Sequence, residues 1–173
     1  MIQVVLIEPE IPQNTGNIAR TCAATHTPLH LVEPLGFHIT DRHLKRAGLD
    51  YWRHVSLMVH SDIHSLRAVL CGMRWVFFSS RATRPYHEYA FREEDCLIFG
   101  PETRGLPEDL IQSSPDHVLS IPIDRTRVRS LNLATTVGVA LFEALRQVSP
   151  RGWVEYREGG HCADPLLTGG NGH

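Results

Sequence analysis

Apolar residues occur along the chain in short continuous runs, separated by longer segments in which apolar positions repeat every three to four residues. Short runs are typical of buried strands, and they span residues 2–7, 29–32, 75–78, 96–99 and 118–121. The longer segments have the period of helices that bury one face. Strands that alternate with helices predict an α/β fold, with a mostly parallel sheet and helices on both faces.

The longer segments predict five helices. The first should begin near Asn14, a favourable N-cap residue after Pro12, and the last should run from Leu131 to Val148. The shorter helices are expected at 41–47, at 62–70 and directly after Pro107.

The last predicted helix has two apolar stripes instead of one. The first consists of Ala134, Val137, Leu141, Leu145 and Val148, and the second of Val139 and Phe142. A helix that is buried on two sides needs two partners, and the sheet supplies one of them. The other is most simply a second copy of the chain, which predicts a homodimer. Small residues such as Gly138 would suit close packing within one subunit equally well.

The chain has 173 residues, which is enough for one domain with a full core and too few for two domains of ordinary size. We expect this domain to span residues 1–150. Residues 151–173 are rich in glycine and polar residues, and such a composition buries too little apolar surface to order a chain. They are predicted to form a flexible tail.

The chain starts without a basic leader, and charges or prolines interrupt every apolar run before the roughly 20 residues that cross a bilayer. This pattern predicts a cytoplasmic protein without a membrane segment. The four cysteines are widely scattered and are expected to be free thiols. No histidine pair has the motif spacing that places two ligands on one helix face, so we predict no metal site.

The formal net charge is −2, so the chain as a whole is not a polycation that attracts nucleic acid. A nucleic-acid site would therefore have to be local. Two basic clusters are candidates, and a plain solvated surface is the alternative for each. They consist of Arg125, Arg127 and Arg129, and of Arg42, Lys45 and Arg46.

Three segments combine polar residues with glycine or proline where predicted strands end, at residues 8–20, 96–107 and 120–134. In an open parallel sheet, ligands bind at the carboxyl ends of the strands, so these segments are candidate sites. Each also has a purely structural interpretation. Asn14 and Arg20 can be a helix cap and a surface charge, and the second segment can be a plain turn. In the third, the side chains at 130 and 132 can serve only as competing caps of the last helix.

The glycine-rich phosphate motifs of dehydrogenases and kinases and the nucleophile elbow of hydrolases are absent from the sequence. Taken together and in order, the three segments instead resemble the three motifs of the SPOUT superfamily of RNA methyltransferases, in particular its TrmH-like 2′-O-ribose branch. The sequences EPEIPQNTGN at 8–17 and RAGLDY at 46–51 are similar to the TrmL (YibK) group. The resemblance covers residues 2–147.

This resemblance implies a reaction, a cofactor and a partner. Members of the group transfer a methyl group from S-adenosylmethionine to the 2′-hydroxyl of the wobble ribose, at cytidine or uridine 34, of leucine tRNAs. The implied partners are the anticodon stem-loop of tRNA and a second copy of the chain. The family also implies a C-terminal part of the sheet threaded into a deep trefoil knot. The alternatives are a related methyltransferase acting on another tRNA or rRNA position, and a non-catalytic RNA-binding protein of the same fold.

The resemblance also assigns site residues. The catalytic and RNA-contacting set is Asn14, Arg20, Glu102, Ser130 and Asn132. The cofactor-binding set is Phe78, Ser79, Ser80, Phe99, Gly100, Glu102, Gly105, Ile121, Ile123, Ser130 and Leu131. A guanidinium is effectively always protonated, so we expect Arg20 to clamp a tRNA phosphate or the reacting hydroxyl. The other catalytic side chains would fix the geometry of the site and orient its loops.

Overall fold

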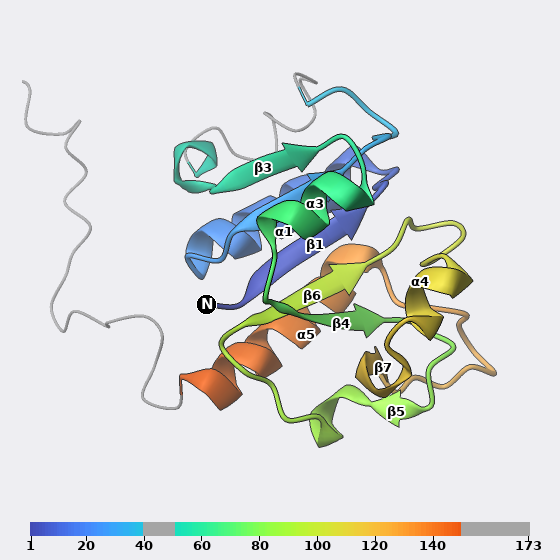
Figure 1. Ribbon diagram of the computed structural model, residues 1–173. Coiled ribbons are helices and arrows are strands. Elements are labelled where there is room, and N and C mark those ends of the chain that lie inside the picture. The colour runs from blue at the N-terminus through green and yellow to red at the C-terminus, as the bar shows by residue number, and fades with distance from the viewer. Residues whose placement is uncertain (40–50, 150–173) are drawn as a thin grey trace, which may run out of the picture.

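The computed structural model describes residues 1–39 and 51–149, and its centre is one sheet in which all neighbouring strands are parallel. The strands of these residues are β1 (Gln3–Ile7), β2 (Leu29–Val32), β3 (Leu57–His60), β4 (Arg74–Phe78), β5 (Arg84–Pro85), β6 (Asp95–Phe99) and β7 (Val118–Ser120). They lie in the order β3-β2-β1-β6-β4-β7-β5 (Figure 1). The predicted α/β fold with a parallel sheet is confirmed.

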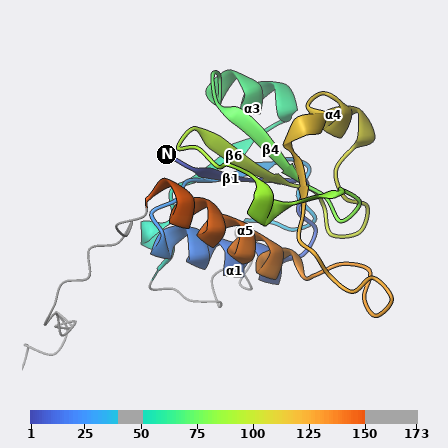
Figure 2. The same cartoon turned by 90° about the horizontal axis from the view of Figure 1, so that it is seen from below.

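Helices cover both faces of the sheet (Figure 2). On one face lie α1 (Pro12–Ala24) and α5 (Leu133–Val148), side by side, and on the other lie α3 (Ile63–Val69) and α4 (Glu108–Gln112). Short 3-10 turns complete the described elements: η1 (Trp52–His54), η2 (Tyr86–Glu88) and η3 (Pro115–His117). Because both faces are covered, the central strands are buried on both sides, which explains their continuous apolar runs.

Strand β1 shows how one strand supplies both hydrophobic cores. Successive side chains of a strand point to opposite faces of the sheet. Val4 and Leu6 pack in the core with α1 and α5, whereas Val5 and Ile7 pack in the core with α3 and α4. All four are fully buried, and each apolar side chain of this size contributes about 1.5–3 kcal/mol by leaving water.

Every strand predicted from an apolar run is present, with ends that differ by at most one residue. The sequence does not predict β3 or β5. Strand β3 lies at the edge of the sheet and its Val59 is 42% exposed, so it lacks a continuous buried run, and β5 has only two residues. The helix predicted at 41–47 and the tail predicted at 151–173 lie outside the described residues.

The start of α1 differs from the prediction that Asn14 caps this helix. The N-cap is Ile11, which makes no side-chain capping bond, and Pro12 stands in the first turn. Proline has a backbone angle preorganised for the first helical position, so it sets the start of the helix. Asn14 therefore lies inside α1, where it is only 6% exposed and its amide is free to make tertiary contacts.

Helix α5 begins two residues later than predicted. Its N-cap is Asn132, whose Oδ1 accepts hydrogen bonds from the backbone N–H groups of Ala134 at 2.9 Å and Thr135 at 3.3 Å. The competition for this cap is thus decided in favour of Asn132 and against Ser130.

The inner stripe predicted on α5 is confirmed, because Val137, Leu141 and Leu145 are buried in the core. Of the second stripe, Val139 is half-buried. Phe142 is 48% exposed.

Three cysteines of the described residues are free thiols. Cys22 and Cys96 are buried, and burial raises the pKa of each thiol to about 12, so both are protonated at neutral pH. Cys71 is exposed. Cys162 lies outside the described residues. Within residues 1–39 and 51–149, no helix is long and apolar enough to cross a membrane, and no group of three metal-ligating side chains occurs.

Candidate functional site

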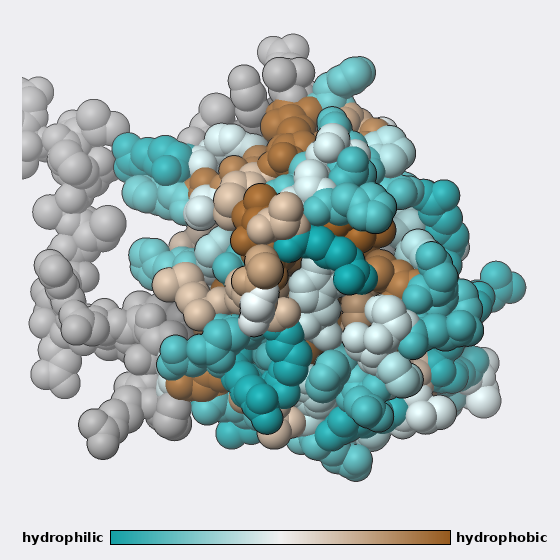
Figure 3. All heavy atoms as spheres, viewed as in Figure 1, coloured by the Kyte–Doolittle hydropathy of each residue, from teal (hydrophilic) through white to brown (hydrophobic). Residues whose placement is uncertain are grey.

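Four neighbouring strands, β1, β6, β4 and β7, end at the same edge of the sheet because all are parallel. The loops that leave them span residues 8–11, 100–107, 79–83 and 121–132. This edge lies at the right in Figure 1, and hydrophilic residues cover most of the same side in Figure 3. The three segments predicted as a site are therefore adjacent in space.

The carboxylate of Glu102 joins the loop after β6 to the loop after β1. Its Oε2 accepts a hydrogen bond from the backbone N–H of Glu10 at 2.8 Å. Its Oε1 accepts from the backbone N–H of Ile11 at 3.3 Å and from Nδ2 of Asn14 at 2.9 Å. Hydrogen bonds to a charged acceptor are stronger than neutral ones, so this carboxylate holds the start of α1 firmly. It also lies at the positive end of the helix dipole.

The amide of Asn14 connects the first two loops to the third. While its Nδ2 donates to Glu102, its Oδ1 accepts from Nδ2 of Asn132 at 2.9 Å. The remaining atom of that second amide, Oδ1 of Asn132, caps α5. A continuous hydrogen-bonded chain therefore runs from the carboxylate through two amides to the start of α5, and we call it the Glu102–Asn14–Asn132 network.

The loop after β1 also holds the loop after β6 from the other direction. The carboxylate of Glu10 accepts from the backbone N–H of Thr103 at 3.0 Å and from its hydroxyl at 2.8 Å. Arg104 forms an ion pair with Glu8, whose backbone is in the left-handed region at φ 47°. Sequence reasoning did not single out these four residues. The sequence did contain a signal for these contacts, because the first candidate segment has two glutamates and the second has a threonine and an arginine that can donate hydrogen bonds to them.

Two glycines shape the loop after β6. A Cβ on Gly100 would lie 2.5 Å from the backbone nitrogen of Leu106, so no larger residue fits there. Gly105 has φ 73°, which L side chains rarely adopt, and its N–H donates to the carbonyl of Pro101 at 3.0 Å. Gly100 is therefore required by the close approach of the backbone at Leu106, and Gly105 by its positive backbone angle.

A model of the SpoU rRNA methylase family matches residues 1–142. The chain belongs to the SpoU methylase family. A tRNA (cytidine(34)-2′-O)-methyltransferase of Methylovorus glucosotrophus is 47% identical to this SpoU methylase over 148 residues, which cover 85% of the chain and 96% of the relative.

Solved structures share the fold of this SpoU methylase. One, from work on the 2-OH methylation of C/U34 on tRNA, matches with a TM-score of 0.80 and 52% identity, covering 85% of this chain and 95% of that one. An AdoMet-bound rRNA methyltransferase from Sinorhizobium meliloti matches with a TM-score of 0.75 and 26% identity, covering 84% of this chain and 56% of that one. The predicted membership of the SPOUT superfamily is confirmed, whereas the threading of a knot stays a prediction.

The predicted cofactor residues of this SpoU methylase divide into a buried floor and an accessible rim. The rings of Phe78 and Phe99 stack at the ends of β4 and β6, with centroids 4.9 Å apart, and both are buried. Ser79 pairs its backbone N–H with the carbonyl of Leu119 at 2.9 Å. The half-buried or exposed members are Ser79, Ser80, Gly100, Glu102, Gly105, Ile121, Ile123, Ser130 and Leu131.

Arg20 does not join the Glu102–Asn14–Asn132 network. It is exposed on α1, and its guanidinium lies 4.8 Å from the centre of the Tyr51 ring. The structure thus brings three of the five predicted catalytic residues together through direct hydrogen bonds, places Ser130 in the adjoining exposed loop, and sets Arg20 apart from them.

The arginines of the loop after β7 are all exposed. Arg127 pairs with Asp124 at 3.2 Å, and hydrogen bonds from Thr126 together with this arginine lower the pKa of the Asp124 carboxyl. Arg125 donates to a carbonyl of the loop after β4, at Ala82. This cluster therefore stands at the same edge as the network, whereas the cluster at 42–46 lies outside the described residues.

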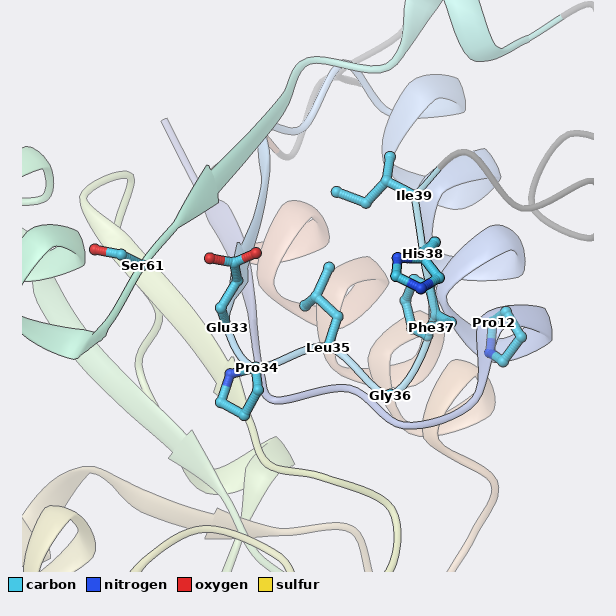
Figure 4. A pocket seen from close by; sticks show the side chains of 9 residues that line it. All are labelled: Pro12, Glu33, Pro34, Leu35, Gly36, Phe37, His38, Ile39 and Ser61. Atoms are coloured by element: carbon cyan, nitrogen blue, oxygen red, sulfur yellow. The ribbon is translucent and has the colours of Figure 1, made fainter.

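A hollow opens beside the site, where β2 and β3 end (Figure 4). Its lining consists of Pro12, Glu33, Pro34, Leu35, Gly36, Phe37, His38, Ile39 and Ser61. Gly36 donates its N–H to the carbonyl of Pro9 at 2.9 Å, and a Cβ there would lie 2.7 Å from Cα of Glu10. The loop of the hollow therefore packs directly against the loop that Glu102 holds.

Proposed function

We propose that this SpoU methylase transfers a methyl group from S-adenosylmethionine to the 2′-hydroxyl of the wobble ribose, at cytidine or uridine 34, of leucine tRNAs. The similarity to a tRNA (cytidine(34)-2′-O)-methyltransferase over 96% of that relative's length is the observation that carries the proposal. The Glu102–Asn14–Asn132 network supports it, since it assembles three loops at one strand-end edge.

The loops after β4, β6 and β7 fit S-adenosylmethionine. They combine an apolar floor of stacked Phe78 and Phe99 with a backbone made accessible at Gly100 and Gly105. Backbone groups at strand ends suit an adenosine, which needs directional donors and acceptors over an apolar surface. Residues 78–80, 99–105 and 121–131 would hold it, and the bound cofactor would supply an electrophilic methyl group.

The chain's own residues would position the nucleophile. A ribose hydroxyl must approach the methyl carbon in line, and holding reactants in that geometry accounts for much of such a rate enhancement. Asn14, Ser130 and Asn132 fix the geometry, and Glu102 orients the loop after β6. Arg20 clamps a tRNA phosphate or the hydroxyl, because a guanidinium cannot accept a proton at neutral pH.

The tRNA would contact the protein through local basic groups, since the net charge of the whole chain is −2. The exposed arginines at 125, 127 and 129 stand at the site edge and suit the phosphates of an anticodon stem-loop. A tRNA substrate also suits a cytoplasmic location.

The chain would act as a homodimer through α5. Phe142 on this helix is 48% exposed, and a Cβ added at Gly138 meets nothing within 4 Å among residues 1–39 and 51–149, which suits close approach of a neighbouring helix. Residues 1–150 would form the methyltransferase domain, with its C-terminal part threaded into a knot, and residues 151–173 a flexible tail.

The test is to incubate the purified full chain with methyl-labelled S-adenosylmethionine and total tRNA, and to map the labelled nucleoside by nuclease digestion and mass spectrometry. We expect label on the 2′-oxygen of nucleotide 34 of leucine tRNAs. Label at another tRNA position, or in rRNA supplied separately, would overturn this substrate assignment. Cofactor affinity without any labelled RNA would instead support a non-catalytic RNA-binding protein.

Two variants test the residue roles in the same assay. Arg20→Ala and Glu102→Gln should each lower transfer by more than about tenfold, because the first removes the clamp on the substrate and the second weakens the charged acceptor that holds the loops of the site together. Glu108→Gln is the matched control, since it neutralises an exposed carboxylate in the first turn of α4, away from the network. Transfer by Arg20→Ala within tenfold of the wild type would contradict the clamp.

A further inference from the structure

The side chain of Tyr51 contacts α1 at two points that lie one turn apart. Its hydroxyl donates to the backbone carbonyl of Gly16 at 2.9 Å, and the guanidinium of Arg20 lies 4.8 Å from the centre of its ring. Positions i and i+4 of a helix share a face, which is why one tyrosine reaches both. Tyr51 therefore contacts the catalytic-set arginine and the backbone turn that precedes it.

Tyr51 is itself held from behind. It is the N-cap of η1, and its carbonyl accepts a hydrogen bond from the backbone N–H of His54 at 2.8 Å. Its half-buried ring packs against the core with α1, and η1 lies beside α1 in both ribbon views (Figures 1 and 2). The backbone of η1 and the packing against the core therefore hold the Tyr51 ring in place.

An aromatic platform suits an arginine that must bind RNA. Among the described residues, no carboxylate lies within ion-pair distance of Arg20. An ion pair would satisfy its donors and cancel its charge, whereas the face of a ring attracts the guanidinium and leaves its N–H groups at the edge available. Stacking on Tyr51 also orders the exposed side chain of Arg20 before RNA binds, so that binding costs less rotamer entropy.

We propose that Tyr51 is a positioning residue for Arg20, and that it holds the guanidinium in the orientation that receives the tRNA. This inference rests on the proposed function, because the ligand of Arg20 is the RNA substrate. If Tyr51 positions Arg20, then the part of its effect that concerns tRNA binding requires Arg20 to be present.

Kinetics of single and double variants of the full chain test this coupling. Tyr51→Leu should lower kcat/KM for tRNA about two- to fivefold, chiefly through KM, with the affinity for S-adenosylmethionine unchanged. Tyr51→Phe keeps the ring and should restore most of the loss. In an Arg20→Ala background, Tyr51→Leu should cause no further loss. Equal losses in both backgrounds would show a purely structural role and overturn the proposal.

The chain offers a matched control for the stacking itself. On the opposite face of the sheet, Arg67 of α3 lies 4.7 Å from the centre of the Trp75 ring. Arg67→Ala breaks a contact of the same type away from the site, and methyl transfer should be unchanged. Thermal unfolding of each variant shows that the fold persists.

A readout that needs no catalysis separates this proposal from the proposed function. Ring currents of Tyr51 should shift the Nε–H signal of Arg20 upfield in a proton–nitrogen correlation spectrum, with the signal assigned through Arg20→Lys. The signal should move downfield in Tyr51→Leu. An unmoved signal would overturn the positioning role even in an active enzyme. A moved signal in a protein that methylates no tRNA would refute the proposed function alone.

Discussion

In the Glu102–Asn14–Asn132 network, the nitrogen of each amide donates a hydrogen bond and its oxygen accepts one or more. The buried amide of Asn14 illustrates this, since its nitrogen serves Glu102 and its oxygen serves Asn132. The oxygen and nitrogen of an amide are not interchangeable, so an aspartate at position 14 would place a carboxylate against a carboxylate. A buried polar group left without its partner costs about 1–3 kcal/mol.

A second set of hydrogen-bonded polar side chains, Gln3, His30 and His60, lies on β1, β2 and β3, on the face of the sheet covered by α3. Nδ1 of His30 is 2.9 Å from Nε2 of His60, and Nε2 of His30 is 2.5 Å from Oε1 of Gln3. Because Oε1 can only accept, a neutral His30 donates from Nε2 and accepts at Nδ1. Burial, and then the nearby His60, lower the pKa of His30 to about 4.

We predict that the free energy of unfolding falls as the pH is lowered from about 6.5 to about 4. In this range the unfolded chain binds a proton at His30 and the folded chain does not, so acid favours unfolding, by about 1–3 kcal/mol in total. The measurement is urea denaturation at several pH values, and His30→Gln should flatten the dependence. If the unfolding free energy of His30→Gln depended on pH as steeply as that of the wild type, His30 would not be the group responsible.

At the scale of elements, the first turn of α5 is the point where fold and site meet. Asn132 caps this helix with its Oδ1 and contacts Asn14 with its Nδ2. One side chain thus serves stability through one atom and the site through the other. These two roles can be separated by substitution.

We predict that Asn132→Ala loses about 1 kcal/mol of stability together with methyl transfer, because an alanine cannot cap. Asn132→Asp should keep the capping contribution, since a carboxylate caps a helix and favours its positive end, and should lose only the contribution of the contact with Asn14. It should still impair methyl transfer, because two oxygens would then face each other at Asn14. Urea denaturation and the tRNA assay measure both effects. Full activity of Asn132→Asp would refute a role for the amide contact.

At the scale of the whole molecule, two exposed apolar side chains lie on opposite faces. Phe142 on α5 is 48% exposed, and Val69 on α3 is 58% exposed. Only the first belongs to a helix with a second apolar stripe. This difference makes the proposed dimer specific to the face of α5.

We predict that Phe142→Arg weakens the dimer about 30-fold or more, because a charge replaces a central aromatic anchor. Sedimentation velocity over a dilution series measures the association. Val69→Arg, on the opposite face, should leave the mass unchanged. A monomeric wild type, or equal behaviour of both variants, would refute a dimer through α5.

Pattern along the chain was enough to predict the strands β1, β2, β4, β6 and β7, the helices α1, α3, α4 and α5, and the three segments that meet at the strand-end edge. Apolar runs and periodicity are local properties of a chain, and they report burial wherever an element is covered. The same reasoning failed at β3, where the apolar run of an edge strand is short and only partly buried, and at Asn14, where a preceding proline set the helix start.

Which groups of these segments meet depends on the three-dimensional fold. Asn14 and Glu102 are 88 residues apart in the chain, and Asn14 and Asn132 are 118 apart. No periodicity spans such distances, because the contacts depend on strand order and on parallel strands ending at one edge. Folding therefore selected Asn132 as the cap, directed Asn14 to Glu102, and placed Tyr51 beneath Arg20.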